Sequence, residues 1–301
     1  MPLWRGKSSG NRVGYGIFIA VLKKLGLRPA YFLLRLVSLY YFLFAWKSSR
    51  HMLYFFQKRL GYSFARSIAA LYKNYYSFGQ SLIDKIAIMS GMANRFSFHF
   101  EGEEHLHQLV HLQKGGLLLS SHIGNWEAAG HLLERLNTRI NVVMFDGEHQ
   151  KIKDYLTSVT GERNAHIIVI KDDLSHIYAI NEALKNRELV CIHADRFVEG
   201  NRTLTSDFLG KAARFPAGPF VLAAQFKVPV CYVFAMKEGR THYHFYSTGI
   251  KEYDYSDKTA AMHQMLSDFT AEMEKKVKLY PAQWYNYYDF WANAETRKHL
   301  E

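Results

Sequence analysis

A histidine and an acidic residue, with four residues between them, form the first candidate for chemistry. In GGLLLSSHIGNWEAAGHLLERL an apolar strand is predicted to end at Ser121 and an amphipathic helix to begin near Asn125, so His122 falls in the turn between them. Ligands of open parallel sheets gather beyond the carboxyl ends of strands, where a helix amino terminus also offers free backbone donors. From the first helical turn, the Glu127 carboxylate can fold back to hold one ring nitrogen of His122. The other nitrogen can then take a proton from an acceptor hydroxyl.

The same two residues also have a structural interpretation. A turn histidine can simply be hydrogen bonded, and a glutamate in the first turn favours the positive end of the helix dipole. On an uninterrupted helix the two side chains would lie about 140° apart at 3.6 residues per turn, so the pair can meet only if the histidine precedes the helix. The spacing alone leaves both interpretations open.

A second group of polar residues follows the predicted strand ELVCIHA. Asp195 and Arg196 come at its carboxyl end, and Lys211 and Arg214 lie farther along, shortly before a helix expected over residues 217–226. Such basic groups near a helix amino terminus can bind phosphates or stabilise a developing oxyanion. The alternatives are a solvated basic loop and, for Arg196, an ion pair that only braces the loop.

The remaining histidines and cysteines predict neither a metal site nor a disulfide framework. His105, His107 and His111 lie close together in EEHLHQLVH, but they lack the three-residue gap and the local cysteine and acidic partners of a common zinc motif. We therefore predict that this segment is a surface helix. Cys191 and Cys231 lie in apolar runs, as small buried hydrophobes do, and a reducing compartment fits them best. P-loop, dinucleotide-binding and serine-hydrolase motifs do not occur in a usable context.

The elements that must position these residues change in character near Asn94. Residues 1 to about 90 have apolar positions at three- and four-residue spacing, which predicts successive helices. After them, short β-rich runs alternate with helical ones, which predicts an α/β fold with a mainly parallel central sheet flanked by helices. A hairpin is expected near the carboxyl end, followed by a helix over residues 258–279. The expected strands are FSFHF, GLLLSS, INVVMF, HIIVI, ELVCIHA, TLTSDFLG, VPVCYVFAM and HYHFYST.

We therefore expect a helical leader, residues 1–90, and an α/β body, residues 91–301, in one structural unit. The formal charge of +11 suits an anionic partner such as nucleic acid, a phosphorylated substrate or an acidic lipid surface. The longest uncharged stretch of the aromatic leader, residues 36–46, is shorter than the ~20 residues that span a bilayer. Its composition predicts helices that lie in one membrane leaflet, with packing on the core as the alternative. The carboxy-terminal run YPAQWYNYYDFW predicts a membrane face or a lid.

At these blocks the sequence resembles the lysophospholipid acyltransferase superfamily, in the branch of the bacterial lipid A late acyltransferases. HIGNWE matches that family's pattern of a histidine, four residues and an acidic residue, and HADR, FLGKAARFPAGP and VPV follow at the family's distances. The leader runs GNRVGYGIFIAVLKKLG and YYFLF are most similar to a subgroup found beside bacterial aryl-polyene or flexirubin pigment genes. The long single spanning helix of lipid A enzymes is missing, which puts lipid A itself in doubt as the acceptor.

The resemblance implies an acyltransferase that uses an acyl carrier protein or coenzyme A thioester as donor, with no metal and no cofactor. It implies His122 as general base, Glu127 as its partner, and roles in the active-site cleft for Asp195 and Arg196. The acceptor is expected to be a hydroxyl, or an amine, of a lipid or glycolipid at the cytoplasmic face of the bacterial inner membrane. An anionic membrane surface is an expected partner, and nucleic acid is not. The predicted substrate-binding residues are Asn125, Asp195, Arg196, Lys211 and Arg214.

A competing hypothesis is a non-catalytic protein that retains this fold and uses its basic charge to bind membrane lipid or nucleic acid. The sequence favours the enzyme, because the His122 and Glu127 pair and the Asp195 and Arg196 block are all present. A binding protein would not need all four residues.

Overall fold

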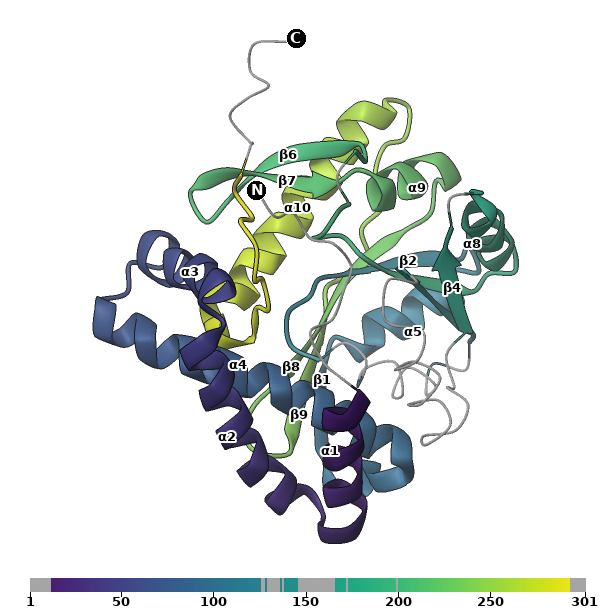
Figure 1. The fold of residues 1–301 in the computed structure, drawn as a ribbon. Helices are drawn as coiled ribbons and strands as arrows, with labels where there is room; N and C mark the ends of the chain where they lie inside the picture. Colours follow the sequence, from purple (N-terminus) through teal and green to yellow (C-terminus); the bar gives the residue numbers. More distant parts are fainter. Residues whose placement is uncertain are drawn as a thin grey trace.

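The computed structural model describes residues 12–125, 128, 136, 138–145, 166–171, 173–198 and 200–292. In this part of the chain, seven strands form one sheet in the order β1, β9, β8, β2, β5, β3, β4, with helices packed around it (Figure 1). The strands are β1 Ser97–Glu101, β2 Gly116–Ser120, β3 Ile140–Phe145, β4 His166–Ile170, β5 Leu189–His193, β8 Val230–Lys237 and β9 His242–Ser247.

The sheet is mostly parallel, as predicted. Strands β8, β2, β5, β3 and β4 all run in one direction, and β9 returns antiparallel to β8 in the expected hairpin. Strand β1 then pairs in parallel with β9 and forms the edge. All five residues of β2 are buried, because a central parallel strand is covered on both faces and reads as a continuous apolar run.

One predicted strand lies outside this sheet. TLTSDFLG forms β6 Thr203–Phe208, which pairs antiparallel with β7 Lys211–Pro216 in a separate two-stranded sheet. Lys211 and Arg214, for which a solvated basic loop was the alternative interpretation, therefore lie on a strand. The hairpin turns through Leu209 and Gly210, both with positive φ, and buries alternate side chains against the next helices. These helices are α9 Gly218–Phe226 and α10 Lys258–Leu279, and α10 has the predicted bounds.

The described leader is a succession of helices, as predicted: α1 Arg12–Leu25, α2 Leu27–Phe44, α3 Trp46–Tyr54 and α4 Phe64–Ala87. Helix α4 begins after Ser63, whose hydroxyl accepts a hydrogen bond from the Arg66 main-chain N–H. Helix α5, Glu103–His111, is the predicted surface helix with three histidines, and α8 spans Ser175–Lys185. Cys191 and Cys231 are buried and free, and burial raises the pKa of each thiol to about 12, so neither is a thiolate at neutral pH.

Helix α2 is longer than the uncharged stretch of the leader. In the described part of the chain it is the one helix long and apolar enough to cross a membrane, judged by length and composition alone. Its 18 residues rise about 27 Å, close to the ~30 Å hydrocarbon thickness. The helix also includes Arg28 and Arg35. These residues do not exclude contact with lipid, because an arginine can extend its charged end toward water.

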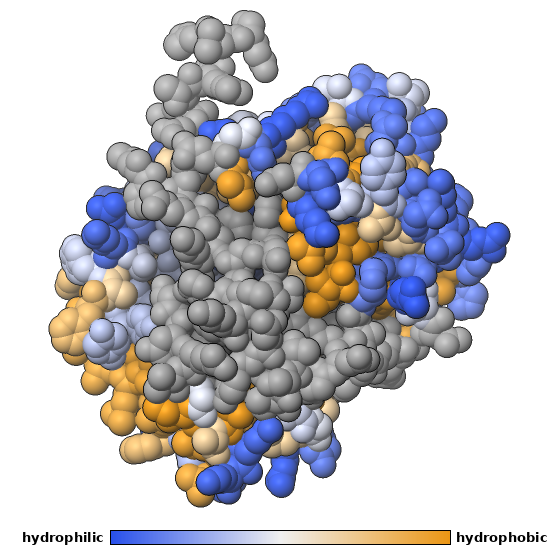
Figure 2. Space-filling model, turned by 45° about the vertical axis from the view of Figure 1, so that its right-hand side comes forward, coloured by the Kyte–Doolittle hydropathy of each residue, from blue (hydrophilic) through white to orange (hydrophobic). Residues whose placement is uncertain are grey.

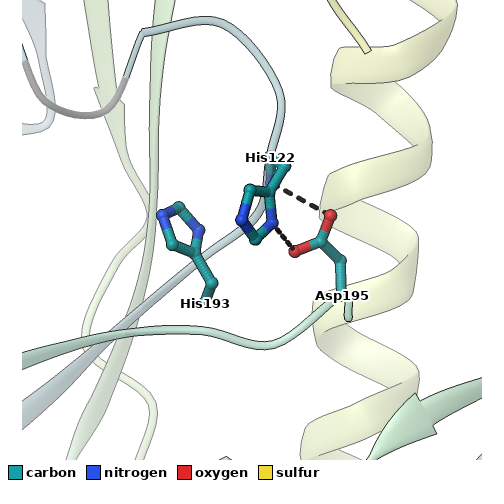
Figure 3. A group of neighbouring side chains, drawn as sticks. All are labelled: His122, His193 and Asp195. Carbon is teal, nitrogen blue, oxygen red and sulfur yellow. Dashed lines mark hydrogen bonds and ion pairs between the residues drawn. The ribbon is translucent and has the colours of Figure 1, made fainter. Parts of the chain in front are cut away.

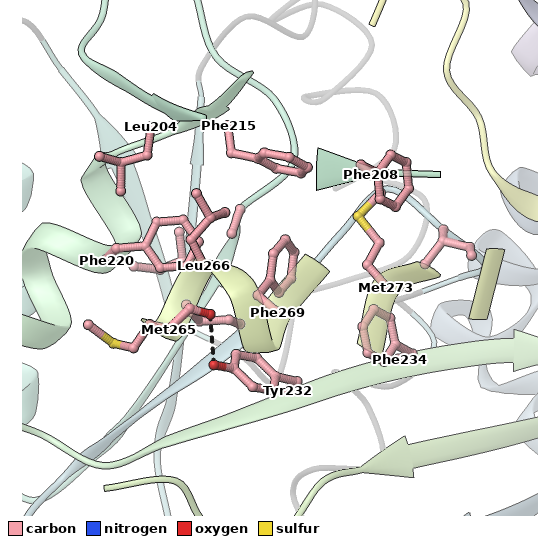
Figure 4. Packing of buried hydrophobic residues seen from close by; sticks show 14 of the residues in the cluster. Leu204, Phe208, Phe215, Phe220, Tyr232, Phe234, Met265, Leu266, Phe269 and Met273 are labelled. Carbon is pink, nitrogen blue, oxygen red and sulfur yellow. Dashed lines mark hydrogen bonds between the residues drawn. The ribbon is translucent and has the colours of Figure 1, made fainter. Parts of the chain in front are cut away.

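The largest apolar cluster lies between the sheet, the β6–β7 hairpin, α10 and the carboxy-terminal segment (Figure 4). Phe215, Tyr232 and Phe269 pack there with their rings at centroid distances of 5.9–6.4 Å. The expectation of a membrane face or lid at the carboxy terminus is wrong for the residues of that run buried in this cluster. Trp284 is fully buried and Trp291 is 5% exposed, so the aromatic density there serves packing.

Candidate active site

The pairing of β2 with β5 brings together the ends of two sequence blocks. The two strands are parallel neighbours, and Ser120 lies opposite His193 at their carboxyl ends. His122 follows Ser120 by two residues and Asp195 follows His193 by two, so the chain delivers both side chains to the same edge of the sheet. This edge is where parallel sheets place their ligands.

His122 and Asp195 are joined by two hydrogen bonds (Figure 3). The Nδ1 atom of the ring lies 2.8 Å from Asp195 Oδ1, and the His122 main-chain N–H donates to Oδ2 at 3.0 Å. The Asp195 side chain is 1% exposed, whereas that of His122 is 26% exposed. One buried carboxylate therefore holds both the ring and the backbone of a histidine that still reaches the surface.

The charge of Asp195 sets the tautomer of His122. Burial opposes ionisation, but the charges of His122 and Arg196 and the hydrogen bond from the ring outweigh it and hold the pKa of this carboxyl below its ordinary value. An ionised carboxylate only accepts hydrogen bonds, so Nδ1 carries a proton. In the neutral ring, Nε2 then has the lone pair that a general base needs.

A second histidine covers one face of the His122 ring. The rings of His122 and His193 stack with centroids 4.3 Å apart and an interplanar angle of 28° (Figure 3). Burial first, and then the charges of His122 and Arg196, lower the pKa of His193 well below the ordinary value of 6.5, so this ring is neutral at neutral pH.

A metal is the other ligand that this group could hold. The potential ligand atoms of His122, His193 and Asp195 lie within 4.8 Å of one another. A histidine ligand points a nitrogen lone pair, which lies in the ring plane, at the metal from about 2.0–2.1 Å. Because the two rings stack face to face, their lone pairs do not converge on one point. The arrangement therefore favours proton transfer over metal binding.

The turn after His122 is held closely by β8 and the carboxy-terminal segment. Gly124 has φ +70°, and a Cβ atom there would lie 1.9 Å from the Ala235 carbonyl oxygen, so the turn requires glycine. The Gly124 N–H donates to the Gln283 carbonyl at 2.9 Å, and the Tyr285 N–H donates to the His122 carbonyl at 3.2 Å. The carboxy-terminal segment is thus a brace for the His122 turn.

Two predicted substrate-binding residues have structural contacts around the His122 turn. Asn125 is 3% exposed, and its amide donates to the Ser81 carbonyl and the Tyr243 hydroxyl. Arg196 donates from Nη2 to the Tyr285 carbonyl, so at least one of its donors fixes the carboxy-terminal segment. Substrate binding by either residue stays a prediction, but these contacts favour a role in holding the site together.

The other basic residues of the set lie on the β6–β7 hairpin. Arg214 donates from Nε to Thr203 Oγ1 at 3.0 Å, and its guanidinium lies 5.1 Å from the centre of the Phe197 ring. Lys211 lies opposite Phe208 at the start of β7 and is half-buried. Their predicted binding of substrate phosphates also stays a prediction.

The predicted partner of His122, Glu127, lies outside the described residues, and its role stays a prediction. The structure instead brings Asp195, expected to bind substrate, to the His122 ring. Sequence reasoning did not single out His193. A signal for it was present, because this histidine ends an apolar strand two residues before Asp195.

The amino-acid sequence is similar to those of known acyltransferases. The family model for bacterial lipid A biosynthesis acyltransferases matches residues 43–291. Over 193 residues the chain is 28% identical to a phosphatidylinositol mannoside acyltransferase of Mycobacterium tuberculosis strain ATCC 25618 / H37Rv, and equally to the protein of that name in strain CDC 1551 / Oshkosh. The alignment covers 61% of this chain and 57% of each relative. The predicted superfamily is confirmed at this level, whereas the likeness to a pigment-gene subgroup stays a prediction.

Proposed function

Because the chain belongs to the bacterial lipid A biosynthesis acyltransferase family, we propose that it transfers a fatty acyl group from a thioester to a lipid or glycolipid acceptor. The donor is an acyl carrier protein or coenzyme A thioester, and the acceptor group is a hydroxyl or an amine. The observation that carries the proposal is the His122 ring, held through Nδ1 by the buried Asp195 carboxylate where two neighbouring parallel strands end.

In the proposed reaction, His122 Nε2 takes the proton of the acceptor hydroxyl as the hydroxyl oxygen attacks the thioester carbonyl carbon. A C–O bond forms, the tetrahedral intermediate collapses, the C–S bond breaks, and the imidazolium returns its proton to the leaving thiolate. The products are an ester and a free thiol, which balances the step. Asp195 stabilises the imidazolium and keeps the ring in the required tautomer, as the carboxylate of a hydrolytic triad does.

Two carboxylates are candidates for orienting the histidine. The motif spacing supports Glu127, and the hydrogen bonds of the described structure support Asp195. We propose Asp195 as the residue that fixes the Nδ1 proton. Its pKa is held below the ordinary value, so it stays ionised across the pH range in which a histidine base works.

We propose that the leader docks the enzyme on a membrane, at its cytoplasmic face. Apolar side chains gather over the N-terminal helices at the lower left of Figure 2. One face of α2 packs on the protein through Tyr31 and Leu34, while other positions of α2 and the start of α3 expose large apolar groups. Basic residues flank them, as in helices that lie at an anionic lipid surface. The exposed groups are Phe32, Leu36, Leu39, Tyr40, Leu43, Phe44 and Trp46.

A non-catalytic lipid-binding protein is the competing function, and the geometry of Asp195 weighs against it. Burying an ionised carboxylate is costly unless it is paired, and here the partner is a ring that still reaches solvent. Adhesion to a membrane or nucleic acid needs surface charge but does not need this buried pair.

The proposal is tested by incubating the purified full-length protein with acyl-carrier-protein and coenzyme A thioesters and a panel of lipid acceptors. The panel contains lipid A precursors, phosphatidylinositol mannosides and lipids from polyene-pigmented bacteria. Mass spectrometry should detect an acylated product that requires both donor and acceptor. Lipid binding without any acylated product across all donors and acceptors would favour the binding protein and contradict the proposal.

A further inference from the structure

A buried polar network connects the His122 turn to the N-terminal helices. It begins at Asn125, the third residue after His122, whose amide nitrogen lies 3.2 Å from the Ser81 carbonyl oxygen of α4 and 3.0 Å from the Tyr243 hydroxyl of β9. Both acceptors are buried with Asn125. The Asn125 side chain therefore contacts α4 and β9, whereas the main-chain N–H groups of Gly124 and Asn125 bond to Gln283 and Ala235.

The next link is the Tyr243 hydroxyl, which donates to the carboxylate of Asp84 on α4. A hydroxyl has one proton, so a Tyr243 hydroxyl that donates to Asp84 must present its oxygen lone pairs to Asn125. This direction fixes the orientation of the Asn125 amide, because only its NH₂ group can donate to the Tyr243 oxygen. The Ser81 carbonyl requires the same orientation of the amide, so the Tyr243–Asp84 hydrogen bond supports the orientation of the side chain beside the His122 turn.

Asp84 receives two further donors in the core. The hydroxyl of Tyr31 on α2 and the ammonium of Lys237 on β8 both bond to its carboxylate. Burial raises the pKa of Asp84, against the lowering effect of Lys237 and of the two tyrosine hydroxyls. Asp84 is 0% exposed and the Lys237 side chain 7% exposed.

A buried ion pair of this kind often stabilises a core no more than apolar residues of similar volume would. Its polar connections lead in one direction to a helix of the leader and in the other to the His122 turn. That placement gives the pair a use that packing alone would not require.

We propose that Tyr243 and Asp84 are positioning residues, which act through Asn125 to hold the His122 turn in its working geometry. The inference rests on the proposed acyl transfer and extends it to residues outside the His122 motif. Misplacing a catalytic group by about 1 Å costs on the order of 10²-fold in rate. Freeing the Asn125 amide should therefore reduce turnover with little effect on substrate binding.

The test compares Tyr243→Phe with Tyr31→Phe in the full-length protein. Each variant removes one buried hydroxyl that donates to Asp84 and keeps the aromatic ring, but only Tyr243 also accepts from Asn125. We expect Tyr243→Phe to lower kcat by about tenfold to a hundredfold with KM nearly unchanged, and Tyr31→Phe to keep kcat within about twofold. Both variants should lower the melting temperature by similar amounts. Equal kcat values for the two variants would overturn the inference.

A double variant provides a second measurement. If Tyr243 acts through Asn125, Tyr243→Phe should have almost no further effect on kcat in an Asn125→Ala background. Additive losses of kcat would contradict the proposed route. If Asn125→Ala fails to fold, the comparison of the two tyrosine variants still decides.

A third readout separates this inference from the acyltransferase proposal. The Nδ1 proton of His122 that faces Asp195 can be followed by NMR without any substrate, and its resonance should shift or broaden in Tyr243→Phe but not in Tyr31→Phe. An unchanged resonance and an unchanged kcat in Tyr243→Phe would contradict only the positioning role. Full turnover by His122→Ala would instead remove the proposed catalytic function, whatever the tyrosine variants do.

Discussion

Replacing Asp195 with asparagine tests whether this carboxylate sets the state of His122. Asparagine keeps the size of the side chain but offers one acceptor where aspartate has two, and both aspartate oxygens are used by His122. If the amide NH₂ faces Nδ1, the ring must accept there and carry its proton on Nε2, where it cannot act as a base. If the NH₂ instead faces the His122 main-chain N–H, two buried donors oppose each other, at a cost of about 1–3 kcal/mol.

The first arrangement should therefore prevail, and the variant should lose general base catalysis. Such a change of tautomer is worth about 10⁴-fold in a hydrolytic triad, and general base catalysis about 10²–10⁴-fold, so we expect kcat to fall by about 10³–10⁴-fold. Acceptor-dependent release of thiol from the thioester, followed with a chromogenic disulfide, gives the rate. Circular dichroism checks that the variant is folded.

Asp207→Asn is the matched control, since it makes the same chemical change at an exposed position of β6. Its rate should equal that of the wild type. Glu127→Gln, measured beside it, distinguishes the two candidate orienting residues. A folded Asp195→Asn enzyme within about threefold of the wild-type rate, together with a much slower Glu127→Gln enzyme, would refute the assignment to Asp195 and restore the motif glutamate.

Two further predictions concern pH and the membrane. Because burial holds the pKa of His193 well below 6.5, the unfolded chain takes up a proton below pH 6.5 that the folded protein does not, and stability should fall there by up to about 1.4 kcal/mol per pH unit for this one group. Urea unfolding at several pH values should show a shallower loss in His193→Gln, and an identical pH dependence would contradict the neutral, stacked ring. Leu36→Glu combined with Leu43→Glu should weaken flotation with anionic vesicles, whereas Tyr178→Glu, at a still more exposed position on α8, should not. Equal flotation of all three proteins would place the membrane contact elsewhere.

Much of the fold could be predicted because it is encoded locally. Apolar runs such as GLLLSS and HIIVI identify strands, and the three- and four-residue spacing of the leader identifies helices. TLTSDFLG forms a strand as predicted, but its place outside the central sheet could not be predicted, because alternation shows that a strand has two faces and not which strand it pairs with. That strand pairs with its own neighbour in the chain, KAARFP, which was not among the predicted strands.

The site could be predicted in position but not in its contacts. The carboxyl-end rule placed both His122 and Asp195 at the correct edge of the sheet. Their hydrogen bond depends on β2 and β5 being neighbours, a pairing between segments about 70 residues apart that no local pattern contains. The prediction for the carboxy-terminal aromatic run failed for a related reason, since a high density of aromatic residues suits a membrane face and a packed core equally well. The partners of Trp284, which include Phe55 and Phe208, decide between them.

The central claim is that His122 is the base of an acyl transfer, and one rate measurement tests it most directly. Acceptor-dependent thiol release is compared between the wild type and His122→Ala, with the melting temperature of each protein measured in the same buffer. A partly exposed turn histidine contributes little packing, so the variant should stay folded while its kcat falls by about 10²–10⁴-fold. A well-folded His122→Ala protein that releases thiol at the wild-type rate would contradict the account.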